Sequence, residues 1–288
     1  CRSISNLSDD IENQTRLGDC NACEILVQVF DIHLNYEAVM FQAAMAVGSL
    51  SSNYLPNSTK LGALGVCDLL TKSLKRHPES VVVAWSTCRA FDSLSTQSDT
   101  IEKEGSCRIV IEAMNHHSRN ELVCEWGCRA ISSMAADQKN RDSLVLHGAC
   151  EVAIMSLQRG TGSGDALVAV VLQKSIGNVS LALSACNAVH SLGVDHDVYR
   201  ERLGSHGACE ALARALQKYA EDEKMASTGC KVIVTLAQNN FLNRSKLGNA
   251  GACKSILMAL EMHRTSQPVA SWGCRAVGLM SEPENGIL

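Results

Sequence analysis

The sequence predicts an all-α fold, a solenoid of stacked helical repeats, on three observations. One block of residues recurs along the chain at intervals of 40 to 44 residues, with one longer interval of 59. The apolar residues of each copy are spaced for one face of a helix, as in Leu212, Ala215 and Leu216. Helix breakers are scarce, since four Pro occur in 288 residues. A period of about 40–47 residues is typical of helical repeats, because one helical hairpin cannot bury its apolar face alone.

The first recurring block carries a Gly-Ala-Cys motif at the expected start of a helix. It reads N-R-S-K-L-G-N-A-G-A-C from Asn243 and Y-R-E-R-L-G-S-H-G-A-C from Tyr199. A third clear copy begins at Asn140, and weaker copies begin near Asn13, Asn57 and Asp99. The Cys of the block recurs at Cys23, Cys67, Cys107, Cys150, Cys209 and Cys253.

A second block follows, and it reads T-C-R-A-F-D-S-L from Thr87 and G-C-R-A-I-S-S-M from Gly127. Its Cys lies 21 residues after the first Cys in four copies, whereas the copy from Asn140 has a spacing of 36. The difference predicts an insertion near 160–174. We therefore expect a single domain over 1–288 with about six repeats, at approximately 13–56, 57–97, 98–139, 140–198, 199–242 and 243–284.

Together the two blocks resemble the armadillo repeat family, whose repeats read N-R-x-x-I-x-x-x-G-A-(apolar)-P-x-L-V-x-L-L and then A-x-x-A-L-x-N-L-A; HEAT repeats are the neighbouring possibility. The resemblance covers nearly the whole chain. It implies a right-handed superhelix in which the third helix of each repeat lines a concave groove. The chain departs from the family at the Pro, which is replaced by Glu24, Asp68, Arg108, Glu151, Glu210 and Lys254. It also departs at the Asn of the third helix, which is replaced by Ser49, Ser93, Ser133, Ser191, Thr235 and Leu279.

Eleven of the fourteen cysteines occupy the two repeat positions, and Cys1, Cys20 and Cys124 are the others. A residue that recurs at one place in every repeat usually answers a packing need, and free Cys behaves as a small apolar residue. We therefore expect buried free thiols, with disulfides within repeats or redox sensing as the alternatives. Free thiols in this number indicate a reducing compartment, the cytoplasm or also the nucleus.

Three motifs could carry other chemistry. The C-N-A-C sequence from Cys20 has the spacing of a metal or redox pair, but no second pair completes a four-ligand zinc site. His116, His117, Cys124 and Cys128 could imitate a mixed zinc site, although Cys128 is already explained as a repeat position. The G-T-G-S-G sequence from Gly160 lacks the Lys-Ser or Lys-Thr of a phosphate loop. We expect no metal, no cofactor and no catalysis.

The resemblance singles out one position of the third helix, where the nuclear-import receptors often carry Trp. Here the position holds Met45, Arg89, Arg129, Asn187, Lys231 and Arg275. Four of these six side chains are basic, and an Arg can form paired hydrogen bonds with a carboxylate. Arg89, Arg129, Asn187, Lys231 and Arg275 are therefore the candidate groove residues, as in the catenin branch, which binds acidic peptides. Trp85, Trp126 and Trp272 are expected on different helix faces.

The function hypothesis is a non-catalytic protein–protein interaction scaffold that binds an extended acidic segment, or a helix, in the concave groove. The alternative is a regulatory or targeting region of a larger multidomain enzyme, such as a kinase or a ubiquitin ligase. A net charge of −4 gives no reason to expect nucleic acid, and no apolar run is long enough for a membrane span. The residues from Ser281 resemble the start of another repeat, so we expect the array to continue.

Overall fold

The computed structural model describes residues 1–95, 105–161 and 178–282. They fall into two compact units, Cys1–Ala149 and Cys150–Leu288, which are considered separately. Within the described ranges every regular element is a helix, which confirms the all-α solenoid. The helices of the N-terminal unit are α1 (Arg2–Leu7), α2 (Ile11–Asp19), α3 (Ala22–His33), α4 (Glu37–Ser51), α5 (Leu55–Ala63), α6 (Val66–Arg76), α7 (Val81–Leu94), α9 (Ser106–His116), α10 (Glu121–Met134) and α11 (Gln138–Leu146). Those of the C-terminal unit are α12 (Ala149–Gly160), α14 (Val179–Gly193), α15 (Asp197–Ser205), α16 (Ala208–Lys218), α17 (Glu223–Ala237), α18 (Phe241–Asn249), α19 (Ala252–Met262) and α20 (Gln267–Met280).

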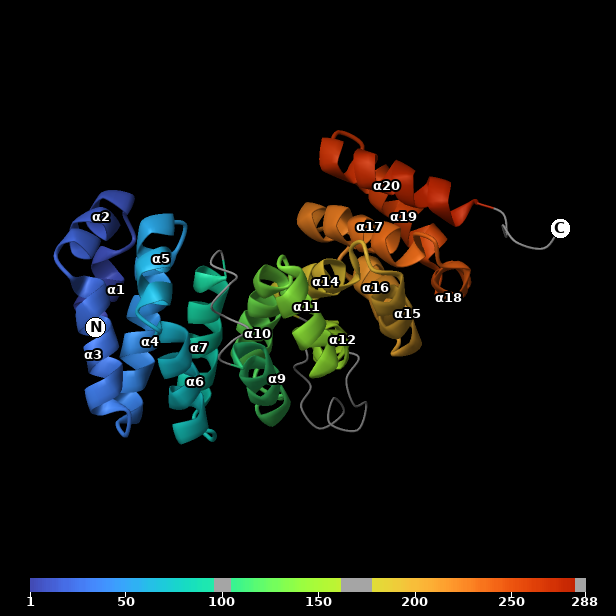
Figure 1. Cartoon of the computed structure of the whole chain (residues 1–288). Helices are drawn as coiled ribbons and strands as arrows, with labels where there is room; N and C mark the ends of the chain where they lie inside the picture. Colours follow the sequence, from blue (N-terminus) through green and yellow to red (C-terminus); the bar gives the residue numbers. More distant parts are fainter. Residues whose placement is uncertain (96–104, 162–177, 283–288) are drawn as a thin grey trace, which may run out of the picture. The chain divides into compact units, whose positions relative to one another are not determined.

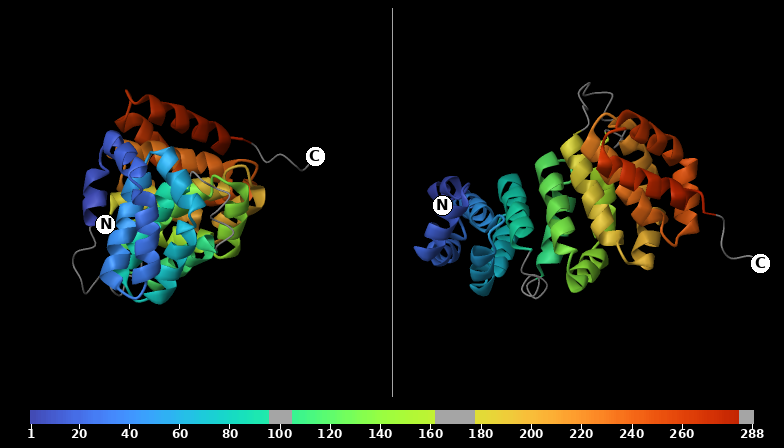
Figure 2. Two further views of the ribbon diagram at one scale, coloured as in Figure 1. Left: turned by 60° about the vertical axis from the view of Figure 1, so that its left-hand side comes forward. Right: turned by 90° about the horizontal axis from the view of Figure 1, so that it is seen from above.

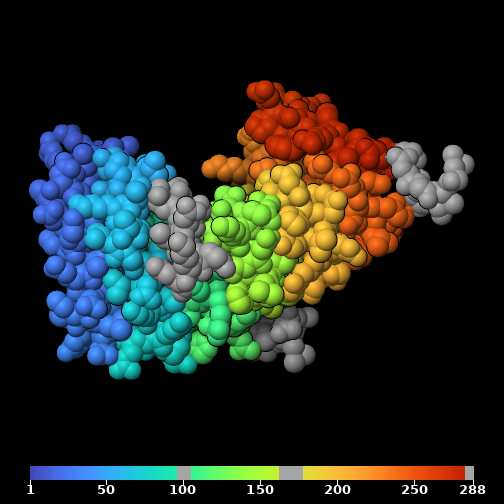
Figure 3. All heavy atoms as spheres, viewed as in Figure 1, coloured from blue at the N-terminus to red at the C-terminus, as the bar shows by residue number. Residues whose placement is uncertain are grey.

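Each complete copy consists of a short first helix, a second helix and a longer third helix. Equivalent helices of successive copies pack on one another. In the N-terminal unit α4 packs on α7 and α7 on α10, while α3 packs on α6 (Figures 1 and 2). In the C-terminal unit α14 packs on α17 and α17 on α20, while α16 packs on α19. In the space-filling view the copies from α2 to α7 form adjacent slabs, coloured blue to teal (Figure 3).

The turn between the first and second helix explains the recurring Gly of the Gly-Ala-Cys motif. The residue before each second helix has a left-handed backbone, which Gly adopts without a steric penalty from Cβ. The φ angle is 76° at Gly65, 91° at Gly207 and 84° at Gly251, and Asn21 takes this role in the first copy with a φ of 62°. The Gly therefore fixes where each second helix begins.

Side-chain caps set the start of the third helices. In every copy but the first, the residue before this helix accepts a hydrogen bond from the backbone N–H three residues on, and this satisfies a donor that the helix leaves unpaired. The capping residues are Ser80, Asn120, Asn178, Asp222 and Ser266. Local sequence thus fixes where the second and the third helix of a copy begin.

The recurring cysteines pack in the interior of both units. Nine of the eleven repeat-position thiols are buried, as is Cys124, and all fourteen cysteines are free. Burial raises the pKa of the Cys88 and Cys186 thiols to about 12, so they stay protonated. The prediction is wrong for Cys253 and Cys274, which are exposed. The equivalent Cys209 thiol donates to the Asn243 carbonyl of the next copy, and no following copy covers α19 and α20 in the described residues.

A buried Asn joins the first helices of neighbouring copies in both units. The Asn57 side-chain Nδ2 donates to the Gln14 carbonyl at 2.9 Å and to the Leu50 carbonyl at 3.1 Å. Asn243 makes the equivalent bonds in the C-terminal unit, to the carbonyls of Arg200 and Leu236, at 2.9 and 3.0 Å. We call this pair of hydrogen bonds the Asn clamp.

The Asn clamp needs a Gly in the preceding copy. A Cβ added to Gly18 would collide with the Asn57 amide, and one added to Gly204 would collide with the Asn243 amide. The recurring Gly of the first helix therefore leaves the space in which the next copy docks.

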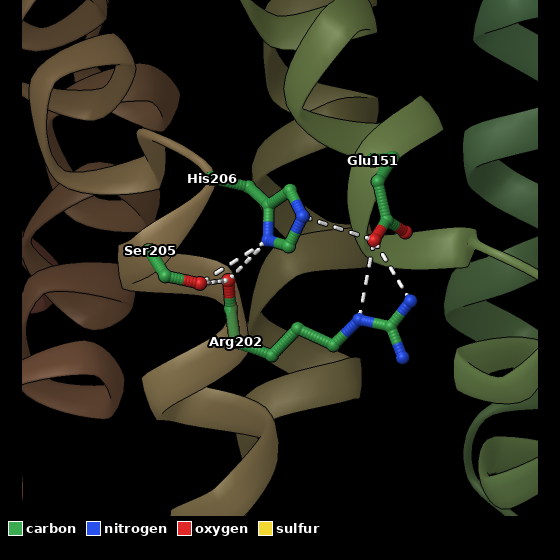
Figure 4. A network of polar contacts seen from close by, with 4 residues as sticks. All are labelled: Glu151, Arg202, Ser205 and His206. Atoms are coloured by element: carbon green, nitrogen blue, oxygen red, sulfur yellow. Dashed lines mark hydrogen bonds and ion pairs between the residues drawn. The ribbon is translucent and has the colours of Figure 1, made fainter.

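Two of the acidic residues at the position of the armadillo Pro, Glu24 and Glu151, link successive copies. Glu151 of α12 accepts hydrogen bonds from Arg202 Nη2 at 2.8 Å and Nε at 3.1 Å (Figure 4). His206 Nε2 lies 3.3 Å from the same carboxylate oxygen. In the N-terminal unit Glu24 pairs with Lys60 at 2.8 Å. At Glu24 and Glu151 the departure from the armadillo pattern thus places an ion pair between copies.

Candidate peptide-binding groove

The five candidate residues occupy one register of the third helices. Each stands directly after the position of the second repeat Cys, on α7, α10, α14, α17 or α20. Arg129, Asn187 and Arg275 are exposed, whereas Arg89 and Lys231 are half-buried. The structure brings Arg89 and Arg129 together in the N-terminal unit.

A pocket of about 620 Å³ opens beside Arg89 and Arg129 in the N-terminal unit. Its walls come from the C-terminal halves of α7 and α10 and from the segment that joins α4 to α5. The lining residues are Ser51, Ser52, Asn53, Tyr54, Leu55, Arg89, Asp92, Ser93, Ser95, Trp126, Arg129, Ser133 and Ala136. We call it the Arg129 pocket.

Arg89 is committed to the preceding copy. Its Nη1 donates to the Met45 carbonyl and to Ser49 Oγ, both at 3.3 Å, and its Nη2 donates to Ser49 Oγ at 3.2 Å. Burial, and secondarily the charge of Arg129, lower the pKa of the Arg89 guanidinium. Arg89 therefore adds positive potential to the pocket, while both of its Nη atoms already donate to the preceding copy.

Arg129 has a different environment, which leaves part of its guanidinium open. Its Nε donates to Asp92 Oδ2 at 3.1 Å, and its Cζ lies 4.2 Å from the centroid of the Trp126 ring. Asp92 Oδ1 also accepts a hydrogen bond from Ser133 Oγ at 2.5 Å. The two Nη atoms of Arg129 make no hydrogen bond with the described residues, and the side chain is 47% exposed. Asp92 and Trp126 thus hold the group with its outer edge free.

The C-terminal unit has a related cluster without the carboxylate. Lys231 Nζ and Arg275 Cζ lie 5.9 and 5.7 Å from the centroid of the Trp272 ring. Val234 of α17 occupies the register of Asp92, and it is buried. The two basic side chains therefore face the Trp ring with no acidic partner from that register.

On the neighbouring helix α14 the Asp92 register holds His190. Its Nδ1 lies 2.6 Å from Thr235 Oγ1, and that hydroxyl donates to the Lys231 carbonyl at 3.1 Å, so His190 Nδ1 is the donor. Burial, and then the charge of Lys231, lower the pKa of His190 to about 4. The imidazole is therefore neutral at physiological pH. Asn187, one turn earlier, is exposed and has no Trp at its side.

The expectation that the three Trp lie on different faces is wrong for two of them. Trp126 and Trp272 share one register, three residues before Arg129 and Arg275, and each stacks with basic side chains of two copies. Trp85 stands one residue earlier in its copy, and its ring packs edge-on against Phe41 at 5.5 Å. The shared sequence W-G-C-R was the available signal.

The histidines that suggested a zinc site make structural contacts instead. His117 Nε2 lies 2.8 Å from the Pro78 carbonyl of the preceding copy, and His116 Nε2 lies 2.9 Å from Glu79 Oε2. The Cys124 thiol donates to the Ser118 carbonyl at 3.4 Å. In the described ranges no three His, Cys, Asp or Glu side chains are grouped as a metal ion requires.

Two further sequence expectations concern the insertion and the membrane. Residues 162–177, which hold most of the expected insertion at 160–174 and of the Gly-rich sequence, lie outside the described residues. Among the helices of the described ranges, none combines the length and the apolar character that a bilayer span demands.

No family model matches the chain, and no curated protein sequence matches it. Several solved structures, in contrast, are similar to the chain in fold. An engineered protein from a structural genomics consortium aligns with a TM-score of 0.73 at 17% identity, over 90% of this chain and 96% of that one. A designed armadillo repeat protein in complex with the peptide (KR)4 aligns with a TM-score of 0.69 at 18% identity, over 89% of this chain and 98% of that one.

A third similar structure belongs to the computationally designed armadillo repeat proteins for modular peptide recognition. It aligns with a TM-score of 0.69 at 18% identity, over 88% of this chain and 98% of that one. At these identities the likeness concerns the fold. The chain therefore has an armadillo-like repeat fold, an all-α solenoid of stacked helical copies that it shares with these designed proteins.

Proposed function

We propose that the chain is a non-catalytic binding scaffold that holds an extended acidic segment of a partner protein against its third helices. The observation that carries this proposal is the Arg129 pocket, in which one guanidinium is fixed by Asp92 and Trp126 while its two Nη atoms stay open. A guanidinium edge of this kind matches the two oxygens of a carboxylate. Charge-assisted hydrogen bonds contribute about 1.5–3 kcal/mol each, so this anchor adds substantially to the affinity of a longer segment.

The proposed charge of the ligand follows from the candidate groove residues and not from the net charge of the whole chain. The net charge of the chain is −4, which by itself repels an acidic peptide. Four of the five candidate groove residues are nevertheless basic. Two of them lie beside Trp126 and the other two lie beside Trp272. A similar solved structure is a designed armadillo repeat protein in complex with the basic peptide (KR)4. We propose the opposite ligand charge for this chain.

The buried thiols support a reducing compartment as the site of action, which we propose to be the cytoplasm or the nucleus. The pKa of Cys150 and of Cys209 rises to about 12 through burial, and both side chains are packed between copies. Such thiols stay unreactive and contribute packing instead of redox chemistry.

The proposal is tested by fluorescence anisotropy with a labelled (DE)4 peptide and, as the charge-inverted control, labelled (KR)4. We expect binding of (DE)4 that weakens as salt rises, and no comparable binding of (KR)4. Arg129→Glu should weaken (DE)4 binding about tenfold or more, and Arg275→Glu should weaken it by a smaller factor. Preferential binding of (KR)4 by the wild-type protein would contradict the proposal.

A matched control separates a local effect from the change in net charge. Arg108→Glu introduces the same charge change on the second helix α9, where Arg108 is exposed and pairs with Glu112. This variant should bind (DE)4 like the wild type. If Arg108→Glu and Arg129→Glu weaken binding equally, the candidate groove residues are not the binding site. Thermal unfolding of each variant verifies that the fold is retained.

A further inference from the structure

The Arg129 pocket contains a feature that distinguishes between two kinds of acidic ligand. Asp92 is itself a carboxylate within the pocket, bound to Arg129 Nε at 3.1 Å and to Ser133 Oγ at 2.5 Å. Its side chain is 15% exposed, so water screens its charge only in part. A ligand oxyanion that reaches the open edge of Arg129 therefore comes close to a fixed negative charge.

The charge balance of the pocket favours a singly charged ligand. Arg89 and Arg129 contribute two positive charges, and Asp92 neutralises one of them. One net positive charge remains for the ligand. A carboxylate brings one negative charge, whereas a phosphorylated side chain brings nearly two at neutral pH. The second charge of the phosphate would find no partner and would be repelled by Asp92.

The hydrogen-bond donors of the pocket lead to the same conclusion. Four of its five serine hydroxyls already donate within the chain, Ser51 to the Val47 carbonyl, Ser93 to the Arg89 carbonyl, Ser95 to the Asp92 carbonyl and Ser133 to the Asp92 carboxylate. The Nη atoms of Arg89 are bound to the preceding copy. The two Nη atoms of Arg129 suffice for the two oxygens of a carboxylate, whereas the third oxygen of a phosphate needs a donor from another part of the lining.

We propose that the Arg129 pocket selects an Asp or Glu side chain of the partner over a phosphorylated Ser or Thr, and that Asp92 sets this selectivity. The inference rests on the proposed function, because it assumes that an acidic segment binds at Arg129. Asp92 acts as a positioning residue. It holds Arg129 against Trp126 through Nε and also supplies the repulsion that excludes a dianion.

The test is an array of acidic peptides in which each sequence is synthesised three times, with Glu, phosphoserine or Gln at one position. Dissociation constants of the best binders are then measured by fluorescence anisotropy. For the wild-type protein we expect the Glu version to bind about tenfold more tightly than the phosphoserine version. The Gln version should be the weakest, since it carries no charge.

The Asp92→Asn variant tests the cause of the selectivity. It keeps the size of the side chain and removes the charge, so the phosphoserine version should gain about tenfold relative to the Glu version. A merely structural role of Asp92 would weaken both peptides by the same factor and leave their ratio unchanged. Glu112→Gln is the matched control, because it removes one negative charge from the exposed face of α9.

The outcomes separate the inference from the proposed function. If the phosphoserine version binds the wild-type protein as tightly as the Glu version, the selectivity is absent while the acidic-peptide scaffold stands. If Asp92→Asn leaves the ratio unchanged, or Glu112→Gln shifts it equally, Asp92 is not its cause. If the Gln and Glu versions bind alike, or no peptide binds, both the inference and the proposed function are overturned.

Discussion

The two units place a Trp beside two basic side chains in the same way, but they differ in what surrounds those side chains. In the N-terminal unit Arg129 stacks on Trp126 and is held by the Asp92 carboxylate of the preceding copy. In the C-terminal unit Lys231 and Arg275 flank Trp272, and the register of Asp92 holds the buried Val234. One cluster is therefore a partly neutralised, oriented site, and the other carries two positive charges without that acid.

The difference shows that a shared frame does not fix the chemistry of its surface. Both units use the same Asn clamp, the same left-handed Gly turns and the same buried Cys positions. These features pack one copy on the next. The groove side chains and their partners differ between the units although this packing is shared, so the ligand preference can change from one copy to another while the packing stays constant.

The largest expected effect is the difference in labelling rate between equivalent Cys positions of the two units. Cys253 and Cys274 are exposed, whereas the equivalent Cys67 and Cys88 are buried. Labelling of the native protein should modify Cys253 and Cys274 at least about a hundredfold faster, because a buried thiol must wait for an opening that costs several kcal/mol. Peptide mapping by mass spectrometry checks this, with exposed Cys20 as the positive control. Equal rates at all four positions would show that the buried packing is wrong.

The Asn clamp should contribute equally in the two units. Asn57→Ala and Asn243→Ala each remove the donor to two buried carbonyls, so each should lower the free energy of unfolding by about 2–3 kcal/mol. Chemical denaturation measures the loss, and Asn249→Ala on the exposed end of α18 is the control. A loss confined to one of the two variants would mean that the units are not held by the same contact.

His190 should make stability depend on pH in the C-terminal unit. Its pKa is about 4 in the folded chain against an ordinary value of 6.5, so the unfolded chain binds more protons between these values. Stability therefore falls as the pH falls from about 6.5 to 4. After allowance for solvent screening the loss is about 1–2 kcal/mol. His190→Asn should show a flatter pH profile in thermal unfolding, and an unchanged profile would exclude this residue as the cause.

The ion pair between Glu151 and Arg202 should have the smallest effect. Burial raises the pKa of Glu151, but the hydrogen bonds from Arg202 and from the backbone outweigh it, and the pKa is lowered. The pair therefore stabilises the folded chain above the ordinary pKa of the carboxyl, and this contribution is lost as the pH falls below it. Because both side chains are partly exposed, Glu151→Gln should cost at most about 1 kcal/mol at neutral pH.

Calorimetry at low and high salt tests the Glu151 prediction, since salt should reduce the difference from the wild type. Glu24→Gln, which breaks the corresponding pair with Lys60, is the matched variant in the N-terminal unit. A large and salt-independent loss for Glu151→Gln would instead indicate that the carboxylate is essential to packing.

Local sequence was sufficient for the helices, the turns and most of the core. A left-handed turn favours Gly, a helix start favours a capping side chain, and a buried helical face needs apolar residues three and four apart. Each requirement concerns residues close together in the chain, as at Gly207 or Asp222. The repeat period then determined that the copies stack, and so which Cys positions are buried.

Only the tertiary structure decided the contacts between copies. Asp92 meets Arg129, His117 meets the Pro78 carbonyl, and Arg89 meets Ser49, all across about one repeat of sequence. These contacts depend on the offset between neighbouring third helices and turns, which no local pattern specifies. For the same reason the sequence indicated four basic groove residues, but it did not show how their guanidinium groups differ. The Nη atoms of Arg89 donate to the preceding copy, whereas those of Arg129 make no hydrogen bond with the described residues. The exposure of Cys253 and Cys274 likewise depends on what packs against α19 and α20, and not on the residues of those helices.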